Sequence, residues 1–129
     1  MAALKDPLRV RGAVRDFALG LPGAYEDFPW GESVVKVNKK IFVFLGEGGG
    51  EGEGGRPPGV TVKLRDEKAH EHAMSAPGAA PAGYGLGRAG WVSIPLGEGA
   101  PGADLLCDWV EESYRAIAPK KLIAELDAG

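Results

Sequence analysis

The chain has 129 residues, of which 44% are hydrophobic and 26% are charged, and its net charge is −3. This length suits one domain that buries about two-thirds of the surface of its unfolded chain, so no disulfide or metal is needed to hold it together. The negative charge excludes an indiscriminate polyanion binder, because binding of that kind needs an overall positive field. The single cysteine excludes an internal disulfide and fits a reducing compartment. Residues 1–10 lack the apolar core of a signal peptide and no segment is apolar over a membrane span, so we expect a cytoplasmic protein.

The first predicted element is a helix with Asp6 at the N-cap and Pro7 at the first helical position. Gly20 and the Pro22-Gly23 pair predict its end. Apolar side chains fall at helical spacing along it, at Val10, Val14, Phe17 and Leu21.

Short runs rich in Val, Ile and Phe predict the strands. Asn38-Lys39 predicts a hairpin turn between two of them. Pro95 indicates that the last strand either lies at a sheet edge or ends there. The predicted strands are 24–28, which is a weak candidate, and 33–37, 40–45, 60–65 and 91–96.

Two glycine-rich segments look at first like phosphate-binding loops. The run 46–59 is acidic and leads into a strand, so it predicts a flexible hairpin connection instead. Residues 85–90 match Gly-x-Gly-x-x-Gly, but they precede a strand, whereas a dinucleotide site needs a helix at that point. Neither segment therefore predicts a nucleotide-binding site.

The remaining elements are helical. Asp66 predicts the cap of a short helix, and Asp104 is a plausible cap for the longest one. Pro119 ends that long helix and starts another short one. The long helix has one apolar stripe, formed by Leu105, Leu106, Trp109, Val110, Tyr114 and Ile117. The order of elements predicts a single α+β domain over residues 1–129, with a two-layer architecture in which helices pack on one face of a mainly antiparallel five-stranded sheet.

No group of side chains forms a convincing catalytic or metal-binding set. His70 and His72 are two residues apart on a predicted helix, so their rings point to nearly opposite sides and cannot share a metal. Cys107 lies beside the apolar stripe with no base near it in sequence, as a structural thiol does. We expect no metal and no cofactor, and enzymatic activity is the less favoured interpretation.

The polar side of the predicted strands combines cations with aromatic rings. Lys63 and Arg65 alternate with apolar residues on one strand, and Trp91 lies on the matching side of another. Lys36 and Lys40 share this face if the hairpin turn has three residues and are separated if it has two. Cations bind phosphate and rings stack on bases, so the pattern predicts a nucleic-acid surface, while a solvated sheet face stays open as the alternative. The candidate residues are Lys36, Lys40, Lys63, Arg65, Tyr84, Arg88 and Trp91.

Several segments, taken in order, resemble the MmcQ/YjbR family of small bacterial proteins. They are residues 28–32, 35–42, 62–64, 84–88 and 91–94, and Ser113-Tyr114 near the end. The resemblance implies a secretion-chaperone-like fold and a DNA-binding role, with Lys40, Lys63, Tyr84, Arg88 and Trp91 at family-pattern positions. The chain departs from the family pattern at Gly85 and Gly87, where His and Asn are common, and at Arg88, where Lys is common.

Two other functions stay open beside DNA binding. One is a protein-interaction or chaperone-like module, either with a partner protein or as a homodimer, that uses Trp30 and Trp91. The other, which ranks last, is a small-molecule-binding protein with a pocket near Tyr84, Arg88 and Trp91. We expect no membrane partner, and the sequence leaves the ligand, the oligomeric state and the pathway open.

Overall fold

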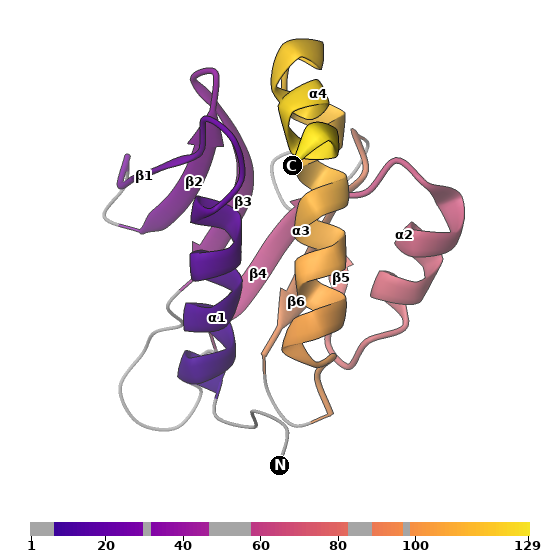
Figure 1. The fold of residues 1–129 in the computed structure, drawn as a ribbon. Coiled ribbons are helices and arrows are strands. Elements are labelled where there is room, and N and C mark those ends of the chain that lie inside the picture. Colours follow the sequence, from indigo (N-terminus) through magenta and orange to yellow (C-terminus); the bar gives the residue numbers. More distant parts are fainter. Residues whose placement is uncertain (1–6, 30–31, 47–57, 83–88, 97–98) are drawn as a thin grey trace.

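The computed structural model describes residues 7–29, 32–46, 58–82, 89–96 and 99–129. A six-stranded antiparallel sheet forms one layer and helices form the other (Figure 1). The predicted two-layer α+β fold is therefore confirmed, with six strands in place of five. Across the sheet the strands are ordered β1 (Tyr25–Asp27), β2 (Ser33–Val37), β3 (Lys40–Gly46), β4 (Gly59–Lys63), β6 (Trp91–Pro95) and β5 (Ala80–Pro81).

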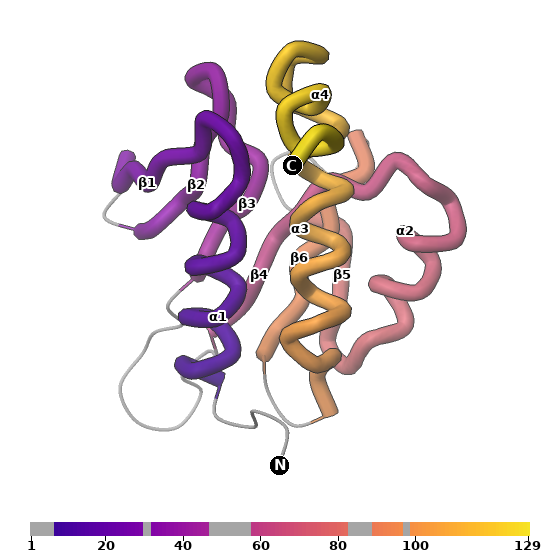
Figure 2. The backbone as a smooth tube through the Cα atoms, viewed as in Figure 1, coloured from indigo at the N-terminus to yellow at the C-terminus, as the bar shows by residue number. Residues whose placement is uncertain are grey.

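The four helices among these residues are α1 (Pro7–Leu19), α2 (Glu67–Met74), α3 (Ala103–Ile117) and α4 (Lys120–Ala128). The backbone tube shows α1 and α3 side by side in front of the sheet, with α2 on the far side of α3 (Figure 2). We call the sheet face toward α1 and α3 the inner face and the opposite one the outer face. The prediction that the helices pack on one face is correct.

The core lies between the inner face and the two long helices. Side chains of a strand alternate between the two faces of the sheet, and here the apolar ones point to the inner face. Each of α1 and α3 has an apolar stripe that packs against this face. The buried side chains include Val10 and Val14 of α1, Val35, Val43, Val62 and Val92 of the strands, and Leu106, Trp109 and Val110 of α3.

Two details differ from the sequence prediction, and the position of Pro95 settles an alternative. The sixth strand, β5, lies between the predicted strands 60–65 and 91–96, and it was missed because a two-residue strand is too short to show periodicity. Of the two alternatives predicted for Pro95, the second is confirmed: β6 ends at Pro95, and it is not the edge strand, because β5 pairs beyond it. Gly102 occupies the N-cap of α3, and Asp104 lies in its first turn. Gly46 pairs with Gly59 at the ends of β3 and β4, and residues 47–57 of the glycine-rich run lie outside the described residues.

The β2–β3 hairpin has a two-residue turn. Asn38 and Lys39 both have positive φ, 51° and 67°, as the tight hairpin turn requires. Val37 pairs with Lys40 and Lys36 pairs with Ile41. Directly opposed side chains point to the same face, so Lys36 lies on the outer face and Lys40 lies on the inner side with Val37.

A β-bulge follows the turn, and α3 completes its hydrogen bonding. Val35 pairs with Val43, so Phe42 is an extra residue in β3. The Ser113 hydroxyl donates a hydrogen bond to the Phe42 carbonyl at 2.5 Å and accepts one from the Lys63 backbone N–H at 2.9 Å. It therefore satisfies two backbone groups in the part of β3 and β4 where the ladder is interrupted.

Two further polar contacts tie α1 and α3 to the rest of the fold. The Tyr114 hydroxyl donates to the Pro22 carbonyl at 2.6 Å. The Arg15 guanidinium binds the Glu26 carboxylate through Nε at 2.9 Å and Nη2 at 2.6 Å, and Ser33 donates to the same carboxylate. We call these five residues, Arg15, Glu26, Ser33, Ser113 and Tyr114, the polar seam.

Candidate functional site

The outer face of the sheet is where the sequence predicted a binding surface. Cross-strand pairing places one row of side chains along it, at Asp27, Val34, Phe44, Thr61 and Ser93. The Thr61 and Ser93 hydroxyls lie 3.0 Å apart and share a hydrogen bond. In the adjacent row Lys63 lies opposite Trp91. The predicted juxtaposition of Lys63 with Trp91 is therefore present.

Trp91 lies on the outer face but is largely covered. Its ring meets the ring of Phe44 edge-on, with centroids 5.4 Å apart, and only 8% of the residue is exposed. Stacking on a base needs an open ring face. Trp91 therefore stiffens this face and offers no stacking platform in this conformation.

Lys36 also lies on the outer face, but its charge is already matched. Its Nζ is 2.7 Å from Asp27 Oδ2 on the adjacent strand. The hydrogen bond between them lowers the pKa of Asp27 and raises the pKa of Lys36, so both groups stay charged at neutral pH. Lys36 is thus a weaker candidate for phosphate binding than the sequence indicated.

Lys40 does not join this face, which corrects the grouping expected from a longer turn. The two-residue turn sends it to the inner side of the hairpin tip, where it is exposed. The register alone causes this, because a slip of one residue moves every side chain to the other face.

Lys63 and Arg65, two cations of the predicted nucleic-acid surface, lie at and just after the end of β4. Lys63 is half-buried, and Arg65 is exposed. Neither has a carboxylate within ion-pair distance among the described residues. The other candidates, Tyr84 and Arg88, lie outside the described residues, as does Trp30.

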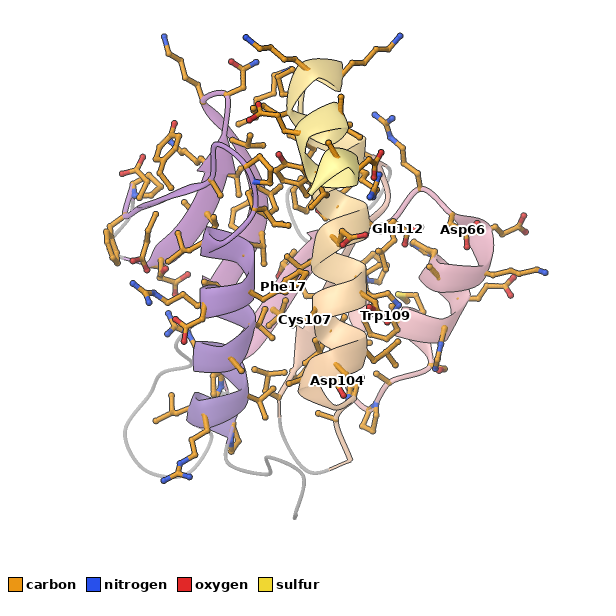
Figure 3. All side chains as sticks on the ribbon, in the orientation of Figure 1. Phe17, Asp66, Asp104, Cys107, Trp109 and Glu112 are labelled. Carbon is orange, nitrogen blue, oxygen red and sulfur yellow. The ribbon has the colours of Figure 1, made fainter. Side chains whose placement is uncertain are left out.

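Sequence reasoning missed a groove between α2 and α3, with a volume of about 490 Å³. Glu112 and Trp109 of α3 lie on the side facing α2, with Asp66 at the start of α2 (Figure 3). Burial, and then the charge of Asp66, raise the pKa of Glu112. Among the described residues no group of three side chains could hold a metal ion. The lining residues are Lys68, Ala69, His72, Leu105, Asp108, Trp109, Glu111, Glu112 and Arg115.

Cys107 has the environment of a structural thiol. It lies on the side of α3 toward Phe17 of α1 (Figure 3) and packs against the core. Burial, together with Asp104 and Asp108, raises the pKa of the thiol to about 11. The thiol is therefore protonated at neutral pH, and this disfavours a nucleophilic role.

Comparison with known proteins identifies the family of this chain and a solved structure with a similar fold. The YjbR family model matches residues 19–116. The chain belongs to the YjbR family. The crystal structure of Deinococcus radiodurans protein DR2400, a domain of DUF419, is similar, with a TM-score of 0.63 and 25% sequence identity over 88% of this chain and 82% of that one. No curated protein matches.

Two residues on which the sequence resemblance to the family rests also hold the fold together. Ser113 and Tyr114 are fully buried, and both belong to the polar seam. The Lys63 amide is bound to Ser113, whereas its side chain projects from the outer face. In the described part of the chain, no helix is long and apolar enough to cross a membrane.

Proposed function

We propose that this YjbR-family protein is a nucleic-acid-binding module that contacts a phosphate backbone through Lys63 and Arg65. One observation carries the proposal. These two cations follow each other at the end of β4 with no carboxylate partner among the described residues, whereas Lys36, Arg15 and Arg115 are each paired with an acid.

The surroundings of Lys63 suit phosphate more than bases. An arginine can bind phosphate through two parallel hydrogen bonds, and hydroxyls such as those of Thr61 and Ser93 also donate to phosphate oxygens. Trp91 is covered, so the outer face offers little for stacking. We therefore expect binding with weak sequence preference and strong dependence on salt.

Titration of fluorescently labelled duplex and single-stranded DNA, at about 50 and 200 mM salt, tests the proposal. We expect saturable binding that weakens with salt. The double variant Lys63→Glu/Arg65→Glu should bind roughly tenfold or more weakly, because it replaces two attractive charges with repulsive ones.

A matched control separates the site from overall charge. Arg9→Glu/Lys68→Glu changes the net charge equally, at exposed positions on α1 and α2. We expect it to bind nearly as well as the natural protein. Equal weakening of the two variants, or no saturable binding at micromolar protein, would rule the site out.

A second function, self-association, is favoured by a separate observation. Tyr25 and Phe28 lie on and just after the edge strand β1, and they are 42% and 55% exposed. Edge strands readily pair with another chain, and exposed apolar residues strengthen such contacts.

Static light scattering over a concentration series tests for a dimer. We expect Tyr25→Ser/Phe28→Ser to weaken it while Leu8→Ser, at an exposed apolar position on α1, does not. A monomer at every concentration would exclude this function.

A further inference from the structure

Four lysines from two distant parts of the sequence lie at one end of the molecule. Lys39 and Lys40 belong to the tip of the β2–β3 hairpin, and Lys120 and Lys121 form the first turn of α4. All four are exposed, and none has an acidic partner among the described residues. We call this group the lysine end.

Core packing holds the two segments of the lysine end together. A Cβ atom built on Gly23, whose φ is 73°, would lie 2.9 Å from Leu122 Cδ1 and 3.7 Å from Val37 Cγ2. Leu122 follows Lys121 in α4, and Val37 is the strand partner of Lys40. Figure 1 shows the hairpin tip and α4 at the same end. Leu122 and Val37 thus lie on either side of the contact with Gly23 and bring the two backbone segments of the lysine end close together.

Stability does not explain why lysine occupies these positions. Lys39 has a φ of 67°, a left-handed conformation in which glycine is the favoured residue. Lys120 and Lys121 lie at the positive end of the α4 dipole, where acidic residues are favoured. That turn contains no acid, and its N-cap residue, Pro119, makes no side-chain hydrogen bond. Local departures from stability rules tend to mark functional surfaces.

We propose that the lysine end contacts the phosphate backbone of duplex DNA. This inference rests on the proposed function and extends its site. Because β3 is antiparallel to β4, Lys40 at the start of β3 lies at the same end of the sheet as Lys63 at the end of β4. Lys63 projects from the outer face and Lys40 from the inner side, so one DNA backbone that contacts both would pass over this end of the sheet.

The same features favour duplex DNA over other polyanions. Single strands are held largely by stacking on aromatic rings, and the segments 38–41 and 119–123 that carry the four lysines contain no aromatic residue. Anionic membranes are usually bound by cations together with inserted apolar side chains. The exposed large apolar residues among those described are Leu8, Tyr25 and Phe28. Leu8 lies on α1, and Tyr25, opposite Lys36, lies on the outer face, whereas Lys40 lies on the inner side.

The salt dependence of duplex binding tests the inference. Each phosphate contact contributes about 0.9 to the slope of log affinity against log salt. Changing all four lysines to glutamine should lower the slope by roughly 2 to 4 and weaken binding to unrelated duplex sequences equally. Two double variants give a matched comparison. The first, Lys39→Gln/Lys120→Gln, removes two positive charges from the lysine end. The second, Arg9→Gln/Lys68→Gln, removes two positive charges from α1 and α2. Only the first pair should change the slope.

The outcomes separate this inference from the proposed function. If Lys63→Glu/Arg65→Glu weakens binding but the fourfold glutamine variant keeps the natural slope, the lysine end is excluded and the proposed function stands. If the natural protein binds neither duplex nor single-stranded DNA at low salt, both are excluded. Binding to single-stranded DNA alone would exclude the inference and leave the proposed function standing. Binding to vesicles that contain phosphatidylserine, lost in the fourfold glutamine variant and without binding to either form of DNA, would exclude both and assign the end to membranes. Urea denaturation of each variant shows that it is folded.

Discussion

The polar side chains of the polar seam have partners inside the protein, whereas those of the lysine end face solvent. In the polar seam each side chain is bound to a partner: Arg15 and Ser33 to Glu26, Ser113 to two backbone groups, and Tyr114 to a carbonyl. In the lysine end four cations lie in solvent without an acidic partner among the described residues.

The seam residues therefore stabilise the fold, whereas the fold does not require the four lysines. Burying a polar group is favourable only when it is hydrogen-bonded, so the seam residues follow from packing. An exposed cation at a positive helix end or in a left-handed turn lowers stability slightly. Substitutions in the seam should therefore lower stability, whereas suitable substitutions in the lysine end should raise stability and lower DNA affinity.

The largest effect is expected at Ser113. Changing Ser113 to alanine leaves the Phe42 carbonyl and the Lys63 amide without their partner inside the protein. We expect the free energy of unfolding to fall by about 2–4 kcal/mol, because each unsatisfied buried group costs roughly 1–3 kcal/mol. Urea denaturation measures this change.

Ser75→Ala is the control for Ser113→Ala. The Ser75 hydroxyl donates to the His72 carbonyl at 2.6 Å but is exposed, so water can replace it. We expect a loss of less than about 1 kcal/mol. Similar losses for the two variants would show that the bulge finds another partner and that the seam is not essential.

A smaller, pH-dependent effect is expected at Glu26. The hydrogen bond from Arg15 and then that from Ser33 lower its pKa, although burial opposes them. The folded state thus releases this proton more readily than the unfolded chain. The stabilisation is complete above the pKa of Glu26 in the unfolded chain, which is about 4.3. It is lost as the pH falls through the lower pKa that Glu26 has in the folded protein.

Glu26→Gln measures this contribution. Near neutral pH we expect a loss of about 1–2 kcal/mol, because the carboxylate is mostly buried but Arg15 is partly exposed to water. The difference from the natural protein should shrink as the pH falls below about 4 and should vanish only below the lowered folded pKa, where the carboxylate is protonated in both states. Urea denaturation across this pH range checks the trend. A difference that stays constant with pH would assign the effect to packing and not to charge.

In the lysine end the expected sign reverses. Lys39→Gly should raise stability by about 0.5–1 kcal/mol, because glycine accepts the positive φ that costs lysine free energy, although the freer unfolded chain offsets part of the gain. The same variant should bind duplex DNA more weakly. Lys40→Gly is the control, since Lys40 lies in a strand, where glycine destabilises. A loss of stability on Lys39→Gly would mean that the lysine side chain supports the turn.

The two regions also show how far the sequence could predict this fold. Strands 60–65 and 91–96 were predictable because one buried face imposes an alternating pattern. The hairpin register was not, because Asn38-Lys39 lacks the glycine that would have indicated a two-residue turn. The cover over Trp91 comes from Phe44 on another strand, and the lysine end joins segments about eighty residues apart. Neither leaves a local sequence pattern.

The smallest expected change in stability, at Lys120, tests the lysine end most directly. Replacing Lys120 with glutamate puts a negative charge at the positive end of α4 and should raise stability by about 0.3–1 kcal/mol at low salt and less at high salt. Duplex affinity should fall together with the salt slope, because an attractive charge becomes repulsive. Lys68→Glu makes the same charge change in the first turn of α2, outside the lysine end, and should leave the affinity nearly unchanged. If Lys120→Glu instead destabilises the protein, Lys120 contributes to folding as the seam residues do. A rise in stability joined to a loss of affinity would show that this lysine serves binding at the expense of the fold.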